Sequence, residues 1–405
     1  MSDVPGATVP LGILDLVPVS TGSDAAQAVR NSIRLAQAAE VLGYRRYWFA
    51  EHHLNRGVAG TTPAVLVALA AAATARIRVG SGGVQSGHRT PLTVVEEFGL
   101  LDAAHPGRID LGIGRSGGRG FFRDRAERAG RAPGLAGVSG AERPREARYT
   151  DTGVLVPVAP SLRHLAAAPR IVLTAELLQQ PQAQGVPYGQ FVEEVAGLVA
   201  GTYRSSEGLD PHPVPGAGAD VEVWVLGSSA GESAEVAGRL GLRFSTAYHI
   251  SPATALDAVD AYRRAFVPSE QLERPYVSVS ADVVVAPDDD EARRLALGYG
   301  LWVRSIRRGE GAIEFPSPGE AARHHWSEED RRLVKDRVDT QLVGSPSTVA
   351  DGLRRLQQAC GADEVLVTTV THDHADRERS YELLAREWAG QHERPGTTIG
   401  SSVRG

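Results

Sequence analysis

The sequence predicts an α/β protein with a (β/α)8 TIM barrel that carries insertions after the fourth and seventh strands. Eight short apolar runs are typical of buried strands, and amphipathic or Ala-rich stretches with helical spacing alternate with them. Strands and helices that alternate through short links indicate a parallel sheet. Eight such units fit a closed barrel better than an open sheet, and 405 residues suffice for a barrel of about 250 residues with insertions.

The first half of the pattern is regular up to the fourth strand. The four strands are expected at Leu11–Val17, Arg46–Ala50, Ile77–Gly80 and Ile109–Gly112. The intervening helices are expected at Ala25–Leu42, Pro63–Ala75 and Thr93–Ala104. The first of these helices ends before Gly43, a residue type that commonly follows a helix C-terminus.

The pattern breaks after the fourth strand. The segment from Arg115 to Pro187 is rich in Gly, Arg, Ala and Pro, and its periodicity is weak. Long irregular segments in compact domains are usually functional or disordered, so we expect residues 119–187 to form an insertion or lid that shapes the substrate pocket. A second irregular stretch is expected at Arg307–Glu328.

Regular order returns in the second half of the chain. Four more strands are expected at Val221–Leu226, Arg243–Ala247, Tyr276–Ala286 and Glu364–Thr369. Helices are expected at Tyr188–Tyr203, Gly231–Leu240, Ala253–Phe266, Asp289–Leu301, Thr348–Cys360 and Arg377–Ala389. We treat residues 1–405 as a single domain with a flexible tail at 391–405.

Composition excludes several classes of protein. The net charge of -6 comes from interspersed charges of both signs, which predicts no nucleic-acid partner. Cys360 is the only cysteine, so an internal disulfide framework and a cysteine-based zinc site are excluded. Met1 to Pro10 lack the features of a secretory signal, and the apolar stretch Ala64–Ala73 is too short to span a bilayer. We therefore expect a cytoplasmic enzyme with no membrane partner.

Active sites of such barrels lie where the strands end, so the residues after each strand deserve most weight. Glu51-His52-His53 follows the second strand and could supply a general base or a metal ligand, although a capping cluster is an equally good interpretation. Gly80–Gly83 follows the third strand. Glycines there would let the backbone approach a flat ligand, but a tight turn explains them at least as well.

Two further loops together suggest an anion site. Arg115 lies among glycines after the fourth strand, and guanidinium groups bind phosphate through two parallel hydrogen bonds. Gly227 to Ser233 follow the fifth strand, where the serines are either N-caps or part of an anion site at a helix N-terminus. We call Arg115 with Gly227, Ser228, Ser229 and Ser233 the anion cradle. It is neither a Walker A nor a GxGxxG motif.

Taken jointly, several sequence blocks resemble the bacterial luciferase-like flavin monooxygenase family. The blocks are Glu51-His52-His53, Gly80–Gly83, His105–Arg108 and the later segments 223–252, 262–286, 342–356 and 367–385. The resemblance covers most of the chain except about 119–187. It implies an enzyme of the kind found in natural-product pathways, which uses FMN, dioxygen and a separate flavin reductase to oxygenate a small-molecule substrate. It also implies a homodimer.

The resemblance also implies roles for particular residues. His52 matches the family's active-site histidine, a candidate base near the reactive edge of the flavin, and Glu51 would lie beside the isoalloxazine ring. Gly82 and Gly83 match the place of a non-proline cis peptide under that ring. Gly114 stands where luciferase has a reactive cysteine. In the anion cradle, Arg115 matches the phosphate-binding arginine, and Ser228, Ser229 and Ser233 fall near its partners. The sequence does not identify a second phosphate arginine, because the insertion begins there, and Arg123 or Arg125 would be guesses.

Three alternatives remain open at this stage. Some relatives of the same fold use a deazaflavin and transfer hydride, which would make the protein a dehydrogenase. A metal-dependent hydrolase would use His52, His53, His372 and His374, but the first strand ends without a His-x-His pair and no lysine near the barrel mouth could bridge two metals. A non-catalytic flavin-binding protein is disfavoured by the intact Glu51-His52 pair. We predict no metal site.

Overall fold

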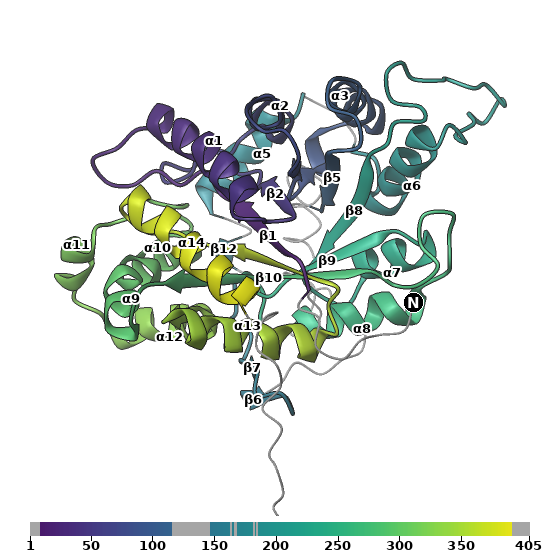
Figure 1. Cartoon of the computed structure of the whole chain (residues 1–405). Coiled ribbons are helices and arrows are strands. Elements are labelled where there is room, and N and C mark those ends of the chain that lie inside the picture. The colour runs from purple at the N-terminus through teal and green to yellow at the C-terminus, as the bar shows by residue number, and fades with distance from the viewer. Residues whose placement is uncertain are drawn as a thin grey trace, which may run out of the picture.

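The computed structural model describes residues 9–115 and 146–390, except residues 163, 166, 167, 181, 182 and 184. Within them, eight parallel strands close into a barrel surrounded by helices, which confirms the predicted fold class (Figure 1). In order of pairing, the strands are β1 (Leu11–Asp15), β2 (Arg46–Phe49), β3 (Arg78–Ser81), β5 (Ile109–Gly114), β8 (Glu222–Gly227), β9 (Arg243–Ala247), β10 (Val277–Val285) and β12 (Glu364–Thr368). The pairing of β12 with β1 closes the ring, with Leu11 opposite Val365.

All eight predicted strands are present, with bounds that differ by two residues at most. The outer helices α1 (Ala25–Val41), α2 (Pro63–Ala73), α3 (Pro91–Ala104), α6 (Tyr188–Val199), α7 (Glu232–Arg239), α8 (Ala255–Ala265), α13 (Pro346–Cys360) and α14 (His374–Gly390) also follow the prediction. Within the described ranges, no helix combines the length and the apolar character needed to cross a bilayer.

Barrel strands are buried on both faces, which explains their continuous apolar sequences. In β2, Tyr47 and Phe49 pack in the layer between the barrel and its helices, whereas Trp48 packs against Trp224 of β8 with ring centroids 5.1 Å apart. Alternate residues of β2 therefore pack into two different hydrophobic cores, one between the barrel and the helices and one that contains Trp48 and Trp224.

A buried ion network lies at the amino ends of the strands. Arg46, the first residue of β2, donates from Nε to Glu364 at 2.7 Å and also pairs with Asp110. Glu222 and Arg78 extend the network. Because buried charges need partners, loss of any one of these side chains would destabilise the end of the barrel opposite the candidate site.

The link between β5 and β8 is more ordered than its sequence suggested. The expectation of an irregular segment from Arg115 to Pro187 was wrong for part of that range, because it contains the paired strands β6 (Arg148–Tyr149) and β7 (Leu155–Val156) and the helix α5 (Pro169–Leu178). Tertiary contacts hold α5: Arg170 donates to Asn55 Oδ1 at 2.9 Å, and Gln179 donates to Gly87 O at 2.5 Å. Residues 116–145, including Arg123 and Arg125, lie outside the described residues.

The segment after β10 also differs from the prediction. The single helix expected at Asp289–Leu301 is two helices, α9 (Asp289–Leu295) and α10 (Leu297–Arg307). The stretch expected to be irregular at Arg307–Glu328 contains α11 (Pro318–Ala322) and leads into α12 (Glu328–Thr340). Ser317 and Glu320 form a capping box at α11, a start signal that was readable in the sequence. A short strand, β11 (Leu342–Gly344), follows α12.

Candidate active site

Segments that follow four neighbouring strands make up the candidate site. In the barrel, β2, β3, β5 and β8 pair consecutively, so their carboxyl ends form one continuous arc. Glu51 and His52 follow β2, Gly82 and Gly83 follow β3, and Arg115 follows β5. Of the remaining residues of the anion cradle, Gly227 ends β8, Ser228 and Ser229 lie in the loop that follows, and Ser233 is in the first turn of α7. The fold thus brings all the predicted site residues to one end of the barrel.

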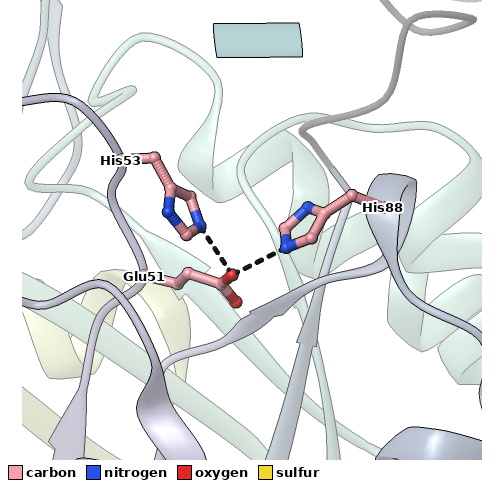
Figure 2. A group of neighbouring side chains, drawn as sticks. All are labelled: Glu51, His53 and His88. Carbon is pink, nitrogen blue, oxygen red and sulfur yellow. Dashed lines mark hydrogen bonds and ion pairs between the residues drawn. The ribbon is translucent and has the colours of Figure 1, made fainter. Parts of the chain in front are cut away.

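Glu51 is the centre of a buried polar cluster (Figure 2). Its Oε1 atom lies 2.9 Å from Nε2 of His53 and 3.1 Å from Nε2 of His88, and both imidazoles point at the carboxylate. Its Oε2 atom accepts a hydrogen bond from the backbone N–H of Gln85 at 2.8 Å. Arg89 adds a positive charge, with Nη2 3.8 Å from Oε1. His88 and Arg89 were not predicted as site residues, because only the fold brings the segment after β4 (Val84–Gln85) to the end of β2.

This cluster fixes the charge of Glu51. Burial raises the pKa of the carboxyl group, but hydrogen bonds from His53 and His88 and the charge of Arg89 outweigh it and lower the pKa to about 2. The carboxylate is therefore ionised at neutral pH and can only accept hydrogen bonds. It follows that the Nε2 atoms of both histidines carry protons toward Glu51.

His52 has the opposite electrostatic character. Its ring is partly buried, and its backbone N–H donates to Gly60 O at 2.7 Å. Burial lowers the pKa of the imidazole to about 4, with His53 lowering it further and Glu51 opposing the shift. Its Nδ1 atom is buried and has no hydrogen-bond partner among the described residues. A neutral imidazole with a free ring nitrogen is available to accept a proton or a hydrogen bond from a ligand.

His249 lies near His52 and was missed by the sequence analysis. It follows β9, is buried, and its Nδ1 lies 2.7 Å from the hydroxyl of Ser280 in β10. Burial, Arg337 and His52 lower the pKa of His249 to about 3. The residue type and its neighbour Tyr248 do not by themselves indicate that His249 belongs to the site. The signal that could have found it is its place directly after a barrel strand.

Gly82 and Gly83 lie between the Glu51 cluster and the anion cradle. The peptide bond that joins them is cis, as the resemblance implied. A Cβ atom at Gly83 would come within 2.6 Å of Gly112 O, and one at Gly82 within 2.5 Å of a methyl group of Leu14. Only glycine fits at Gly83, because the backbone there runs directly against the backbone of β5, whereas at Gly82 the nearest atoms belong to the side chains of Leu14 and Trp48.

The anion cradle is assembled at the N-terminus of α7. Nη1 of Arg115 lies 3.0 Å from Oε2 of Glu232, the first residue of the helix. Gly231 precedes the helix, and no side chain caps its N-terminus. Ser233 is buried and hydrogen-bonds Tyr188, whose hydroxyl also donates to Ile113 O at 3.3 Å. Tyr188 and Glu232 were not predicted. Ser228 and Ser229 lie in the loop before Gly231, where Ser228 O accepts from Thr254 at 2.5 Å.

The four histidines of the metal-dependent alternative do not come together. His372 contacts Thr21, with Nε2 3.1 Å from Oγ1, and His374 pairs with Glu378. Within the described part of the chain, the one cluster of His, Cys, Asp or Glu side chains with ligand atoms close enough to share a metal ion is Glu51, His53 and His88. Arg89 beside this cluster supplies the positive charge that a metal would otherwise bring, so hydrogen bonding explains the arrangement.

Comparison with known proteins agrees with this fold and identifies the family. The sequence model of the luciferase-like monooxygenases matches residues 9–133 and 192–364. The chain belongs to the luciferase-like monooxygenase family and is an oxidoreductase. It is 34% identical to the uncharacterised protein YvbT of Bacillus subtilis over 93% of this chain and 96% of that protein. It is 32% identical to a luciferase-like monooxygenase of Escherichia coli K12 over the same shares of each chain.

Solved structures show the same fold. The structure of apo-MsnO8 aligns with a TM-score of 0.70 and 29% identity, covering 94% of this chain and 98% of that one. The oxygenating component of 3,6-diketocamphane monooxygenase from Pseudomonas putida, solved with FMN, aligns with a TM-score of 0.57 and 19% identity over 95% and 98% of the two chains. An F420-dependent reductase of Methanopyrus kandleri aligns with a TM-score of 0.54 and 17% identity over 94% and 98%. Such distant matches support the fold alone.

Proposed function

We propose that the protein is a monooxygenase that uses reduced FMN and dioxygen to oxygenate a small organic substrate. One observation carries the proposal: Arg115, ion-paired with Glu232, lies at the uncapped N-terminus of α7 on the same arc of strand ends as His52. A phosphate bound at the cradle would direct the rest of an FMN molecule along this arc toward His52. Family membership favours oxygenation over other uses of the fold.

Three features of the site fit a flavin with a phosphate. The cis peptide of Gly82 and Gly83 follows β3, between the Glu51 cluster and the anion cradle, where the ring of an FMN bound at the cradle would lie. His52 offers an unpartnered nitrogen where a ring or substrate atom could bind. The cradle offers a guanidinium, buried Ser233 and an uncapped helix N-terminus, which together suit a phosphate.

Each residue then has a distinct role. Bound reduced flavin supplies the electrons for the reaction with dioxygen. Glu51 stays ionised and holds His53 and His88 in place beside the ring, while His52 stays neutral and accepts a proton from the substrate. Arg115 and Ser233 bind the phosphate. The diketocamphane enzyme holds FMN on the same fold, and the F420-dependent reductase keeps a deazaflavin as the alternative cofactor.

Two partners belong to this proposal. A separate flavin reductase supplies the reduced FMN, as the resemblance to the flavin monooxygenases implies. We also propose a homodimer, in which two copies pair through α2 and α3, where Val65, Leu69, Leu92 and Leu100 are exposed.

A comparison of FMN with riboflavin tests the cradle, because only FMN carries a phosphate. We expect Arg115→Ala to weaken FMN binding by about tenfold and to leave riboflavin binding unchanged, since a charge-assisted hydrogen bond contributes roughly 1.5–3 kcal/mol. Arg115→Lys keeps the charge but not the forked geometry, so its affinity for FMN should lie between those of the wild type and Arg115→Ala. Equal weakening of both ligands would contradict the assignment of Arg115.

A further inference from the structure

Glu232 is an acidic residue in the middle of a site proposed to bind an anion. Its Oε2 atom accepts a hydrogen bond from Arg115 at 3.0 Å, and its Oε1 atom accepts one from the backbone N–H of Gly189 at 3.2 Å. Gly189 lies in the first turn of α6, so the carboxylate is held between Arg115 and a second helix N-terminus. An anion built into the chain thus already uses donors that a phosphate would need.

The ion pair is placed so that it can open. The side chains of Arg115 and Glu232 are 42% and 44% exposed, and exposed pairs of this kind contribute little net free energy because water screens them. If Arg115 turned to a phosphate, Glu232 would keep its hydrogen bond from Gly189. Ser233 and Tyr188 lie behind the pair and are buried, so they stay in place when it separates.

We propose that Glu232 is a specificity-determining residue that competes with the cofactor phosphate for Arg115. The proposal rests on the proposed function and deepens it. A bound phosphate must displace the Glu232 carboxylate from the guanidinium of Arg115. The phosphate then remains close to the negative charge of Glu232. Glu232 therefore lowers the affinity for FMN and speeds its release. Such exchange is what an oxygenase needs when its reduced flavin arrives from, and its oxidised flavin returns to, a separate reductase.

The test is the effect of Glu232→Gln on flavin binding. The amide keeps the size of the side chain but removes the charge that competes for Arg115. We expect the Kd for FMN to fall roughly three- to tenfold and its dissociation rate to fall in proportion, with the Kd for riboflavin unchanged. Binding can be followed by quenching of flavin fluorescence, and folding of each variant by circular dichroism.

Glu235→Gln is the matched control. Glu235 lies on the same helix but lines a separate surface depression with Asp257 and Asp260, so the variant makes the same change in net charge away from Arg115. It should bind FMN within twofold of the wild type. Comparable tightening in both variants would show a general charge effect and would overturn the inference.

Other outcomes are equally decisive. Weaker or unchanged FMN binding by Glu232→Gln would mean that Glu232 orients Arg115 or does nothing there, and would overturn this inference alone. A separate measurement, the binding of riboflavin and FMN by the wild type, tests the proposed function itself. If the wild type binds riboflavin as tightly as FMN, the anion cradle itself is wrong, and the competition falls with it.

Discussion

Nε2 of His88 lies 3.1 Å from Oε1 of Glu51, which ties the turn after β4 to the segment that ends β2 (Figure 2). The two residues are 37 positions apart in the sequence and meet because β2 and β3 are neighbours in the barrel. His53 contacts the same carboxylate oxygen, so the buried Glu51 has two imidazole donors. This contact is the basis of the first prediction.

Glu51→Gln should destabilise the protein in a pH-dependent way. The folded-state pKa of about 2 lies below the ordinary value of 4.5, so the ionised carboxylate stabilises the fold fully above pH 4.5, and this stabilisation is lost as the pH falls toward 2. We expect the free energy of unfolding to drop by about 3 kcal/mol at pH 7 and by roughly half of that at pH 3. Urea denaturation at both values measures this difference.

Glu97→Gln is the control for that experiment. Glu97 also pairs with Arg89, at 2.8 Å, but its side chain is more exposed. Glu97→Gln should lower the free energy of unfolding by less than about 1 kcal/mol. A loss for Glu51→Gln that is the same at pH 7 and pH 3 would show that the charge of Glu51 does not carry the stabilisation.

His52→Ala should separate catalysis from binding. If His52 is the base, turnover should fall roughly 10²–10⁴-fold, while the Kd for FMN stays within about twofold because the anion cradle is intact. Since the pKa of His52 is about 4, the wild-type rate should decline only as the pH approaches that value, with no inflection near 6.5 from this group. Steady-state rates across pH 4–8 measure this. A variant that retains full turnover would remove His52 from the mechanism.

Arg170→Ala should loosen α5 without unfolding the barrel. Arg170 donates to Leu54 O and to Asn55 Oδ1, so it attaches α5 to the segment that follows Glu51-His52-His53. We expect faster amide hydrogen exchange in residues 169–178 and little change in the barrel strands. Arg170→Lys keeps the charge but cannot make both contacts in the same way and should show an intermediate effect. Unchanged exchange in both variants would mean that other contacts hold α5.

Leu100→Glu should weaken self-association. Leu100 is 61% exposed on α3, and α2 packs beside α3 (Figure 1). A charge in the centre of an apolar contact costs several kcal/mol, enough to shift a dimer to monomers at micromolar concentration. Sedimentation velocity of the wild type and of the variant measures the shift. Val41→Glu, at an apolar site that is 83% exposed at the end of α1, is the control and should leave the dimer intact.

The strands and most outer helices could be predicted because their local sequence carries the signal. Continuous apolar runs such as the one in β10 occur where both faces are buried, and α1 shows helical spacing and an Asp24 N-cap. In contrast, α5 is held by contacts from Arg170 and Gln179 to distant loops, and these are invisible in its own sequence. The charged helix α12 lacks an apolar stripe clear enough to reveal it.

The same distinction applies to the site. Residues directly after strands, such as His52 and Arg115, were predictable because a barrel places its active site there. His88 and Tyr188 were not, since each reaches the site from a turn or helix that packs against it only in three dimensions. Glu232 is adjacent to predicted Ser233, but its role depends on a partner 117 positions earlier in the chain. The residues that could not be predicted are those whose role depends on contacts with distant parts of the chain.

The most direct measurement is an anaerobic titration of the purified protein with reduced FMN and with a reduced deazaflavin, followed by oxygen. Saturable binding of reduced FMN, with reoxidation kinetics in oxygen that differ from those of free flavin, is the predicted result. Binding of the deazaflavin alone would make the protein a hydride-transferring dehydrogenase. Binding of neither would contradict the flavin site that Glu51, His52 and Arg115 are proposed to form.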